Sequence, residues 1–293
     1  MKGIAVLLFI LVVSTSSFAF GFDWQQLHEQ SSDISLKEAG QAVEEDPGSL
    51  EDLYVLGLGY LDEYEVEEAE KIFRKMLEID ISNIPAQWGV AECLRRKGDC
   101  DICMRLLNEI IAAKPDFAPA YISLAYMKYM QMDFNETVKL AYKVIKLGKE
   151  NVDLKNFVRA HGLLAGAKGM IAHYGGPLSK VINGRAVMPY LQKAKALDPD
   201  SVTVYYGLGS YYLLTPPVFG RDVDKAIEYL KKAVEADSLF ADAYVRLAQA
   251  YKEQGKLSLY DQYINKAEQI GPNSRLVEDI KSGTCNFICI NPD

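Results

Sequence analysis

Residues 54–58 read YVLGL, residues 88–92 read WGVAE and residues 122–126 read ISLAY. Each stretch begins 34 positions after the one before it, and each has Gly or Ala at its fourth position. A period of 34 residues is the spacing of stacked helix–turn–helix units. Because one such hairpin cannot bury its apolar face alone, the units must pack against their neighbours. The sequence therefore predicts an all-α, right-handed solenoid of about six helical hairpins with capping helices.

The same signals can be followed along most of the chain. Small residues recur at the helix contacts, and Gly98 and Gly255 stand where the turn between two helices favours glycine. The expected organisation is a signal peptide over 1–19, a partial repeat that caps the stack over 22–46, three regular units over 50–151, a degenerate unit with an insertion over 152–200, two regular units over 201–272, and a capping helix with a tail over 273–293.

Two regions depart from the regular repeat. In the degenerate unit we expect helices over 154–173 and 186–197, with inserted residues between them. In the partial repeat, we expect Ser32 or Asp33 to cap a helix that begins at Leu36.

The residues at these offsets resemble the tetratricopeptide-repeat family. The family pattern is an aromatic residue, Leu-Gly or Leu-Ala, Tyr, Gly, Ala and Pro at fixed offsets, and the resemblance covers about 50–272. The unit that begins at Ala241 carries the pattern most fully, with Tyr244, Leu247, Ala248, Tyr251, Gly255, Ala267 and Pro272. The resemblance implies a concave face made by the first helix of each unit, where members of the family bind peptides.

Composition and charge exclude several classes of protein. The chain has 293 residues, of which 49% are hydrophobic, so it is not a disordered polypeptide. A net charge of −8 argues against a nucleic-acid partner and against attraction to an anionic membrane surface. No nucleophile–base pair, phosphate loop or metal-ligand spacing is present in the sequence, so we expect no enzyme, catalytic residue, metal or cofactor.

The N-terminus has the features of an export signal. Lys2 precedes an apolar run over 4–13, and Ser17-Phe18-Ala19 fits the small-x-small cleavage rule. The run has ten residues, fewer than the roughly 20 that span a bilayer, although an uncleaved anchor is the alternative. We therefore expect an exported protein, periplasmic or secreted, without a membrane span after cleavage.

The five cysteines leave their pairing open. Cys100 and Cys103 have the CxxC spacing of redox motifs, but no βαβ unit accompanies them, and Cys103 stands in the small-residue position of its repeat. We therefore favour a structural role for Cys103, and the pairing of Cys93 stays open. Cys285 and Cys289 could close a small disulfide loop in the tail.

The expected concave face is aromatic and apolar. Arg95 and Arg96 alone offer charge comparable to the Lys, Asn and Arg clamp with which the family holds a C-terminal carboxylate, so that ligand is not expected. Aromatic anchors suit a hydrophobic peptide, or an apolar small molecule held by ring contacts. The predicted binding residues are Tyr54, Trp88, Arg95, Tyr126, Tyr129, Gly166 and Tyr206.

Two further features bear on the ligand. Gly162, Gly166 and Gly169 share one face of a helix and either leave room for a ligand or let a neighbouring helix pack closely. The loop 216–222 is similar to the PPxxGGD loop of some exported bacterial repeat proteins, including the T component of tripartite ATP-independent periplasmic transporters, although Arg221 replaces the second Gly.

The leading hypothesis is therefore an exported interaction scaffold with a protein or peptide partner. The alternative is a periplasmic accessory protein that binds an apolar small molecule or peptide for a transporter. An open groove would favour the scaffold, and an enclosed pocket near the degenerate unit would favour the accessory protein.

Overall fold

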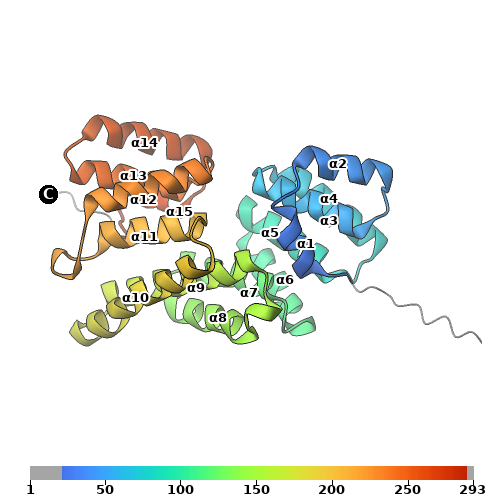
Figure 1. Ribbon diagram of the computed structural model, residues 1–293, viewed down its shortest axis with the longest axis horizontal. Helices are drawn as coiled ribbons and strands as arrows, with labels where there is room; N and C mark the ends of the chain where they lie inside the picture. Colours follow the sequence, from blue (N-terminus) through green and yellow to red (C-terminus); the bar gives the residue numbers. More distant parts are fainter. Residues whose placement is uncertain (1–21, 289–293) are drawn as a thin grey trace, which may run out of the picture.

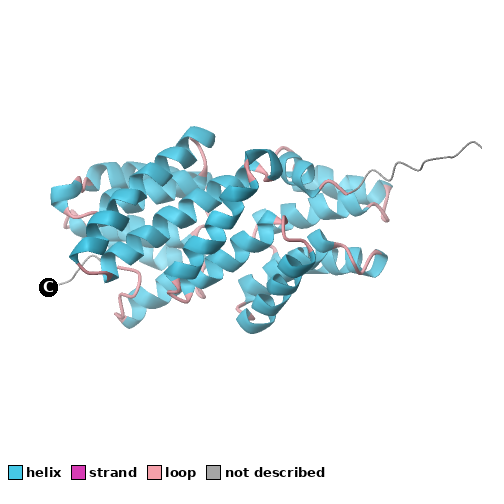
Figure 2. Cartoon of the chain, turned by 90° about the horizontal axis from the view of Figure 1, so that it is seen from below, coloured by secondary structure: helices cyan, strands magenta, loops and turns pink. Residues whose placement is uncertain are grey.

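The computed structural model describes residues 22–288, which contain fifteen α-helices and no strand (Figures 1 and 2). Consecutive helices stack as hairpins, as the 34-residue period predicts. The six hairpins are α3 (Leu50–Asp62) with α4 (Val66–Ile79), α5 (Ile84–Lys97) with α6 (Cys100–Ala113), α7 (Ala118–Met130) with α8 (Phe134–Leu147), α9 (Leu154–Tyr174) with α10 (Pro177–Leu197), α11 (Val202–Leu214) with α12 (Val223–Ala236), and α13 (Ala241–Glu253) with α14 (Leu257–Ile270).

Shorter elements flank and connect the hairpins. They are α1 (Trp24–Ser31) and α2 (Leu36–Glu45) before the first hairpin, α15 (Arg275–Ser282) after the last, and the 3-10 helices η1 (Lys149–Asn151) and η2 (Pro217–Phe219) in two loops.

Small residues allow the close helix contacts. Phe73 of α4 is fully buried, and its ring lies against Gly57 of α3 and Gly89 of α5. A Cβ atom added at Gly57 would lie 2.7 Å from that ring, and one added at Gly89 would lie 2.3 Å from it. Since real Cβ atoms do not approach so closely, both positions require glycine for this packing.

The turns within four of the six hairpins share one backbone conformation. Tyr64, Gly98 and Met132 are 34 positions apart and have φ angles of 61°, 92° and 62°, and Gly255 has 72°. The sequence analysis identified the two glycines, but Tyr64 and Met132 adopt the same left-handed conformation with a side chain, at a cost of about 1 kcal/mol each.

Two predicted helix boundaries were wrong. The cap of α2 is Ser35, not Ser32 or Asp33, because Ser35 and Glu38 form a reciprocal capping box directly before the helix. The second helix of the degenerate unit begins at Pro177 rather than at residue 186. Proline suits a first helical turn, so the inserted residues lengthen α9 and α10 to 21 residues each instead of forming a loop.

The solenoid curves until its two arms touch. Figure 1 shows α1–α6 on one side, α11–α15 on the other, and α7–α10 joining them. The Tyr64 hydroxyl, in the α3–α4 turn, donates a hydrogen bond of 2.9 Å to the carboxylate of Asp237, at the end of α12. Residues 173 positions apart in the chain thus meet across the concave side.

Candidate functional site

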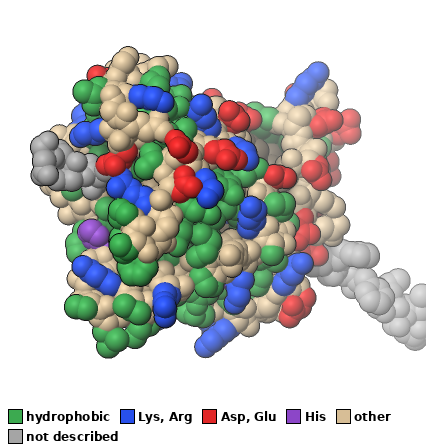
Figure 3. All heavy atoms as spheres, turned by 60° about the vertical axis from the view of Figure 1, so that its left-hand side comes forward, with side chains coloured by type: hydrophobic (Ala, Val, Ile, Leu, Met, Phe, Trp, Pro, Cys, Tyr) green, Lys and Arg blue, Asp and Glu red, His purple; other side chains and the backbone are tan. Residues whose placement is uncertain are grey.

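A single continuous groove of about 2280 Å³ follows the concave side of the solenoid. Its lining comes from helices at both ends of the chain and from the long helices α9 and α10 between them. Figure 3 shows that one side of the molecule exposes many hydrophobic side chains, interspersed with acidic and basic groups. Of the predicted binding residues, the groove is lined by Trp88, Arg95, Tyr126, Tyr129, Gly166 and Tyr206.

Three half-buried tyrosines form the aromatic part of this lining. Tyr126 and Tyr129 lie one helical turn apart on α7, and Tyr206 lies on α11 of the opposite arm. Burial raises the pKa of all three phenols above the ordinary value, so each stays a neutral hydroxyl that can donate a hydrogen bond. The tyrosines therefore offer ring faces and polar tips to the same space.

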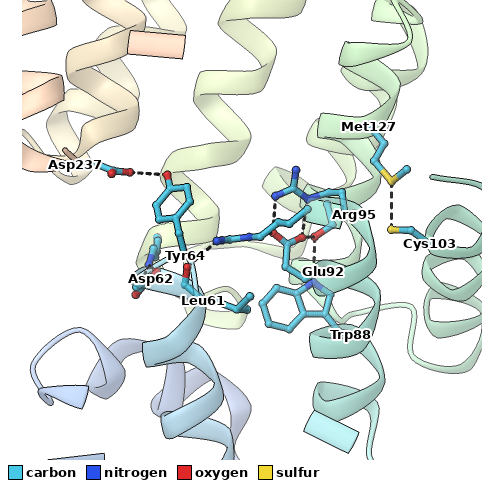
Figure 4. A network of polar contacts seen from close by, with 12 residues as sticks. Leu61, Asp62, Tyr64, Trp88, Glu92, Arg95, Cys103, Met127 and Asp237 are labelled. Carbon is cyan, nitrogen blue, oxygen red and sulfur yellow. Dashed lines mark hydrogen bonds and ion pairs between the residues drawn. The ribbon is translucent and has the colours of Figure 1, made fainter. Parts of the chain in front are cut away.

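A buried ion-pair network lies beside them (Figure 4). Glu92 accepts two hydrogen bonds from the Arg95 guanidinium, at 2.6 and 2.9 Å, one from Arg96 at 3.2 Å and one from the Ser123 hydroxyl at 2.9 Å. Burial alone would raise the pKa of Glu92, but the two arginines and the hydroxyl outweigh it and hold the pKa well below 4.5. The Arg95 guanidinium also lies 4.7 Å from the centre of the Tyr126 ring.

Trp88 belongs to this network more than to the groove surface. Its side chain is 5% exposed, and the indole N–H donates a hydrogen bond of 3.1 Å to Ser123. The Ser123 hydroxyl that accepts this bond donates in turn to Glu92, so Trp88 is linked to the network through Ser123. Trp88 is therefore unsuited to an alanine test, because truncation of a buried Trp costs about 3 to 5 kcal/mol of stability.

Tyr54 does not line the groove, and its placement differs from the expectation. It is fully buried under α1, where the His28 ring stacks on it and His28 Nε2 lies 2.6 Å from the Tyr54 hydroxyl. The expected partial repeat thus does more than cap the stack, since α1 covers part of the concave face of the first unit. The repeat pattern places Tyr54 on that face but does not reveal what covers it.

The glycine face of α9 serves close packing. A Cβ atom at Gly162 would lie 2.4 Å from Thr203, one at Gly166 would lie 3.3 Å from Tyr129, and the Gly169 position has only loose contact. All three glycines still border the groove. The contacts at Gly162 and Gly166 favour the packing interpretation of these residues, with α9 brought close to α11 and α7.

A second buried polar group was missed by the sequence analysis. Asp242 and Arg246 of α13 are 7% and 3% exposed and both line the groove. Burial raises the pKa of Asp242 above 3.8, although a hydrogen bond of 2.5 Å from Ser274 and the charge of Arg246 offset part of the effect. The repeat alignment gives no signal for Arg246, because the first two units have Val55 and Gly89 at that offset.

The cysteines and acidic residues of the described chain form no metal site. Cys100 is exposed and Cys103 is buried, both are free thiols, and burial raises the pKa of Cys103 to about 12. A thiol that stays protonated is a poor nucleophile, so these observations favour the structural role for Cys103. Cys285 is disulfide-bonded, and Cys289, its expected partner, lies outside the described residues.

The proline loop borders the groove. Asp222 caps α12 by accepting a hydrogen bond of 3.0 Å from the Lys225 amide, and Arg221 pairs with Glu253 of the next unit. Pro216 and Phe219 contribute to the groove lining. Among residues 22–288 no helix has the length and hydropathy to cross a membrane.

Comparison with known proteins supports the fold. No protein-family model matches the chain. The human tetratricopeptide repeat protein 21B is 23% identical over 243 residues, which are 72% of this chain and 18% of that protein. This chain thus spans less than a fifth of that relative.

Two solved structures resemble the chain in three dimensions. The complex of Cut9 and Hcn1 from the APC/C matches with a TM-score of 0.58 and 17% identity, over 87% of this chain and 47% of that one. A tetratricopeptide repeat protein from Parabacteroides merdae matches with a TM-score of 0.53 and 15% identity, over 88% of this chain and 96% of that one. With the 34-residue period and the six helical hairpins, these likenesses show that the chain has the tetratricopeptide-repeat fold.

Proposed function

We propose that the chain is an exported scaffold that binds an extended segment of a partner protein in its aromatic groove. The observation that carries the proposal is one continuous groove whose lining includes Tyr126, Tyr129 and Tyr206. Tyrosine and arginine supply a large share of the binding energy in protein interfaces. Here Arg95 lies over the Tyr126 ring, so the two side chains present a joint surface to a ligand.

The size of the groove favours a polypeptide over a small molecule. Small-molecule pockets measure about 300 to 1,000 Å³, whereas this groove measures about 2280 Å³. An extended peptide would use its length and would present apolar side chains to the rings and main-chain groups to the hydroxyls.

One observation favours the second candidate, an accessory protein that holds an apolar small molecule. The hydrogen bond between Tyr64 and Asp237 crosses the groove from one arm to the other. A ligand held under this contact would be enclosed, as the transporter-accessory hypothesis expects.

Export remains part of the proposal and rests on the sequence. The signal-peptide features lie within residues 1–19, outside the described residues. An exported location would place the groove in the periplasm or outside the cell, where its partner would have to be found.

A capture experiment with matched variants tests the proposal. The mature protein is crosslinked in the exported fraction, and proteins retained by the unmodified chain are compared with those retained by Tyr126→Ala and Tyr206→Ala. Tyr205→Ala is the control, because Tyr205 adjoins Tyr206 on α11 but does not line the groove. We expect at least a tenfold loss of one partner with both groove variants and no loss with the control.

The outcomes separate the two candidates. Equal retention by all four proteins would refute a groove-bound partner. If no protein is retained but a small apolar compound raises the thermal midpoint of the unmodified chain and not of Tyr206→Ala, the accessory function is supported instead.

A further inference from the structure

The segment that follows α15 turns back into the concave side of the last repeats. Gly283 ends α15 with a φ angle of 69°, and residues 284–288 then run toward α7 and α13. Phe287 is 3% exposed, and its ring stacks on that of Tyr129 at a centroid distance of 5.8 Å. Ile288, one residue further on, lines the groove.

Side chains hold the main chain of this segment. The amides of Asn286 and Phe287 donate hydrogen bonds of 2.7 and 2.9 Å to the two carboxylate oxygens of Asp279. The carbonyl of Asn286 accepts a bond of 2.6 Å from the Tyr174 hydroxyl, and that of Phe287 accepts one of 2.5 Å from Arg246. All four main-chain polar groups of these two residues are thus bonded by side chains.

Arg246 also binds the main chain of the next residue, Ile288. One nitrogen of its guanidinium donates to the Phe287 carbonyl and the other to the Ile288 carbonyl at 2.8 Å. Arg246 is 3% exposed and Asp279 is 5% exposed, so both charges are taken out of water. Such burial is costly unless the charges are bonded, and here main-chain groups of the segment supply the bonds.

This arrangement has the chemistry of peptide recognition. In α15 the apolar side chains of Leu276 and Val277 cover the last repeat while the helix bonds its own main-chain groups. Asn286 and Phe287 lie outside a helix, and the partners of their main-chain groups are side chains of α9, α13 and α15. Hydrogen bonds to consecutive main-chain amides and carbonyls recognise an extended chain of any sequence. A ring that stacks on one side chain of the peptide, here called the aromatic seat, adds selectivity for an aromatic residue at that position. The seat is formed by Tyr129, whose ring also packs edge-on against Phe134.

We propose that Arg246, Asp279, Tyr174 and Tyr129 form a site for an extended peptide with one aromatic side chain, and that residues 284–288 occupy it as an internal ligand. This inference rests on the proposed function, because it names the chemistry of the segment that the groove binds. The tethered segment is present at an effective concentration in the millimolar range. A partner peptide must displace it, so the tail lowers the apparent affinity for partners.

Binding of the tail peptide in trans tests the inference. The probe is a labelled, air-oxidised synthetic peptide with the sequence of residues 281–293, and the receptor is the full chain. In the variant Phe287→Asp the tethered segment carries a charge that the aromatic seat rejects, so the site becomes free. We expect this variant to bind the peptide at least tenfold more tightly than the unmodified chain, by fluorescence anisotropy.

Two controls make the test specific. A peptide with Asp at the position of Phe287 should bind at least tenfold more weakly to the variant chain. The double variant Phe287→Asp, Arg246→Lys should bind the native peptide at least tenfold more weakly, because a lysine ammonium lacks the planar fork with which Arg246 directs two N–H donors at two neighbouring carbonyls. If Phe287→Asp does not fold, Asn286→Pro replaces it, since proline removes the amide that donates to Asp279 and so weakens the attachment of the tethered segment.

The results distinguish this inference from the proposed function. Equal binding of the peptide by the unmodified and the released chains would overturn the internal-ligand site, even if Tyr126→Ala and Tyr206→Ala still lose a captured partner. Tight binding by the released chain supports the site. If capture by the tyrosine variants is then unchanged, the proposed function fails while the site stands.

Discussion

Replacement of Glu92 by glutamine tests the polar network beside the groove. Glu92 accepts four hydrogen bonds in the structure, from Arg95, Arg96 and Ser123, and it is 7% exposed. Glutamine has only one oxygen that can accept these bonds. In place of the second oxygen it has an NH2 group, which would face the N–H and O–H donors of the arginines and Ser123. Removal of one partner from a buried ion pair costs about 3 to 5 kcal/mol. We therefore expect Glu92→Gln to lower the free energy of unfolding by about that amount at pH 7.

The pH dependence of this loss can be given a sign. The pKa of Glu92 is lower in the folded protein than its ordinary value of 4.5, so between the two pKa values the unfolded chain binds more protons. The stabilisation by Glu92 is complete above 4.5 and is lost as the pH falls toward the folded pKa. The difference in free energy of unfolding between wild type and Glu92→Gln should shrink by about 1.4 kcal/mol for each pH unit below 4.5, until the pH reaches the folded pKa.

Urea unfolding followed by circular dichroism, at pH 7 and at pH 3.5, measures both effects. The control is Glu67→Gln, because the Glu67 side chain is 73% exposed and lies 3.9 Å from Lys97. An exposed pair contributes at most about 1 kcal/mol, so the control should change little. A loss below about 1 kcal/mol for Glu92→Gln, or a loss of equal size at both pH values, would refute the reasoning.

Three further predictions concern packing, charge and export. Gly89→Ala should destabilise the fold by about 1 to 3 kcal/mol, because the added Cβ meets the Phe73 ring. Gly40→Ala is the control: an added Cβ has nothing within 4 Å there, so the variant should be more stable by up to about 1 kcal/mol, and urea titration measures both. The pKa of Asp242 is raised in the folded protein, so ionisation of this carboxyl destabilises the fold as the pH rises above 3.8. The stability of Asp242→Asn relative to wild type should therefore increase from pH 3.5 to pH 7, as measured by thermal melts. N-terminal sequencing of exported protein should find a start soon after Ala19, and Leu8→Arg should block export.

The repeat architecture could be predicted from the sequence because the residues that determine it recur locally at a fixed period. Gly57 and Ala91 stand one period apart at helix contacts, and a fixed period predicts stacked hairpins wherever it recurs. The same period could not predict that Tyr64 takes the turn conformation of Gly98, because a tyrosine at that offset carries no turn signal. The inserted residues of the degenerate unit were placed in a loop for a similar reason, since no period applies to them.

The groove was predicted in outline and missed in detail. Tyr126, Tyr129 and Tyr206 line it as the repeat offsets indicate, and their role in binding stays a prediction. The burial of Tyr54 depends on α1, which folds back onto the first unit through contacts that no local pattern encodes. Arg246 was missed because its partners, the carbonyls of residues 287 and 288, lie more than 40 positions away.

Site-specific photocrosslinking tests the central claim most directly. A photoreactive phenylalanine derivative is placed at position 206, which faces the groove, or at position 205, which adjoins it on α11 but does not line the groove. We predict that the derivative at position 206 crosslinks a polypeptide in the exported fraction and that the derivative at position 205 does not. Crosslinking from position 205 alone, or equally from both, would contradict a binding surface on the concave side.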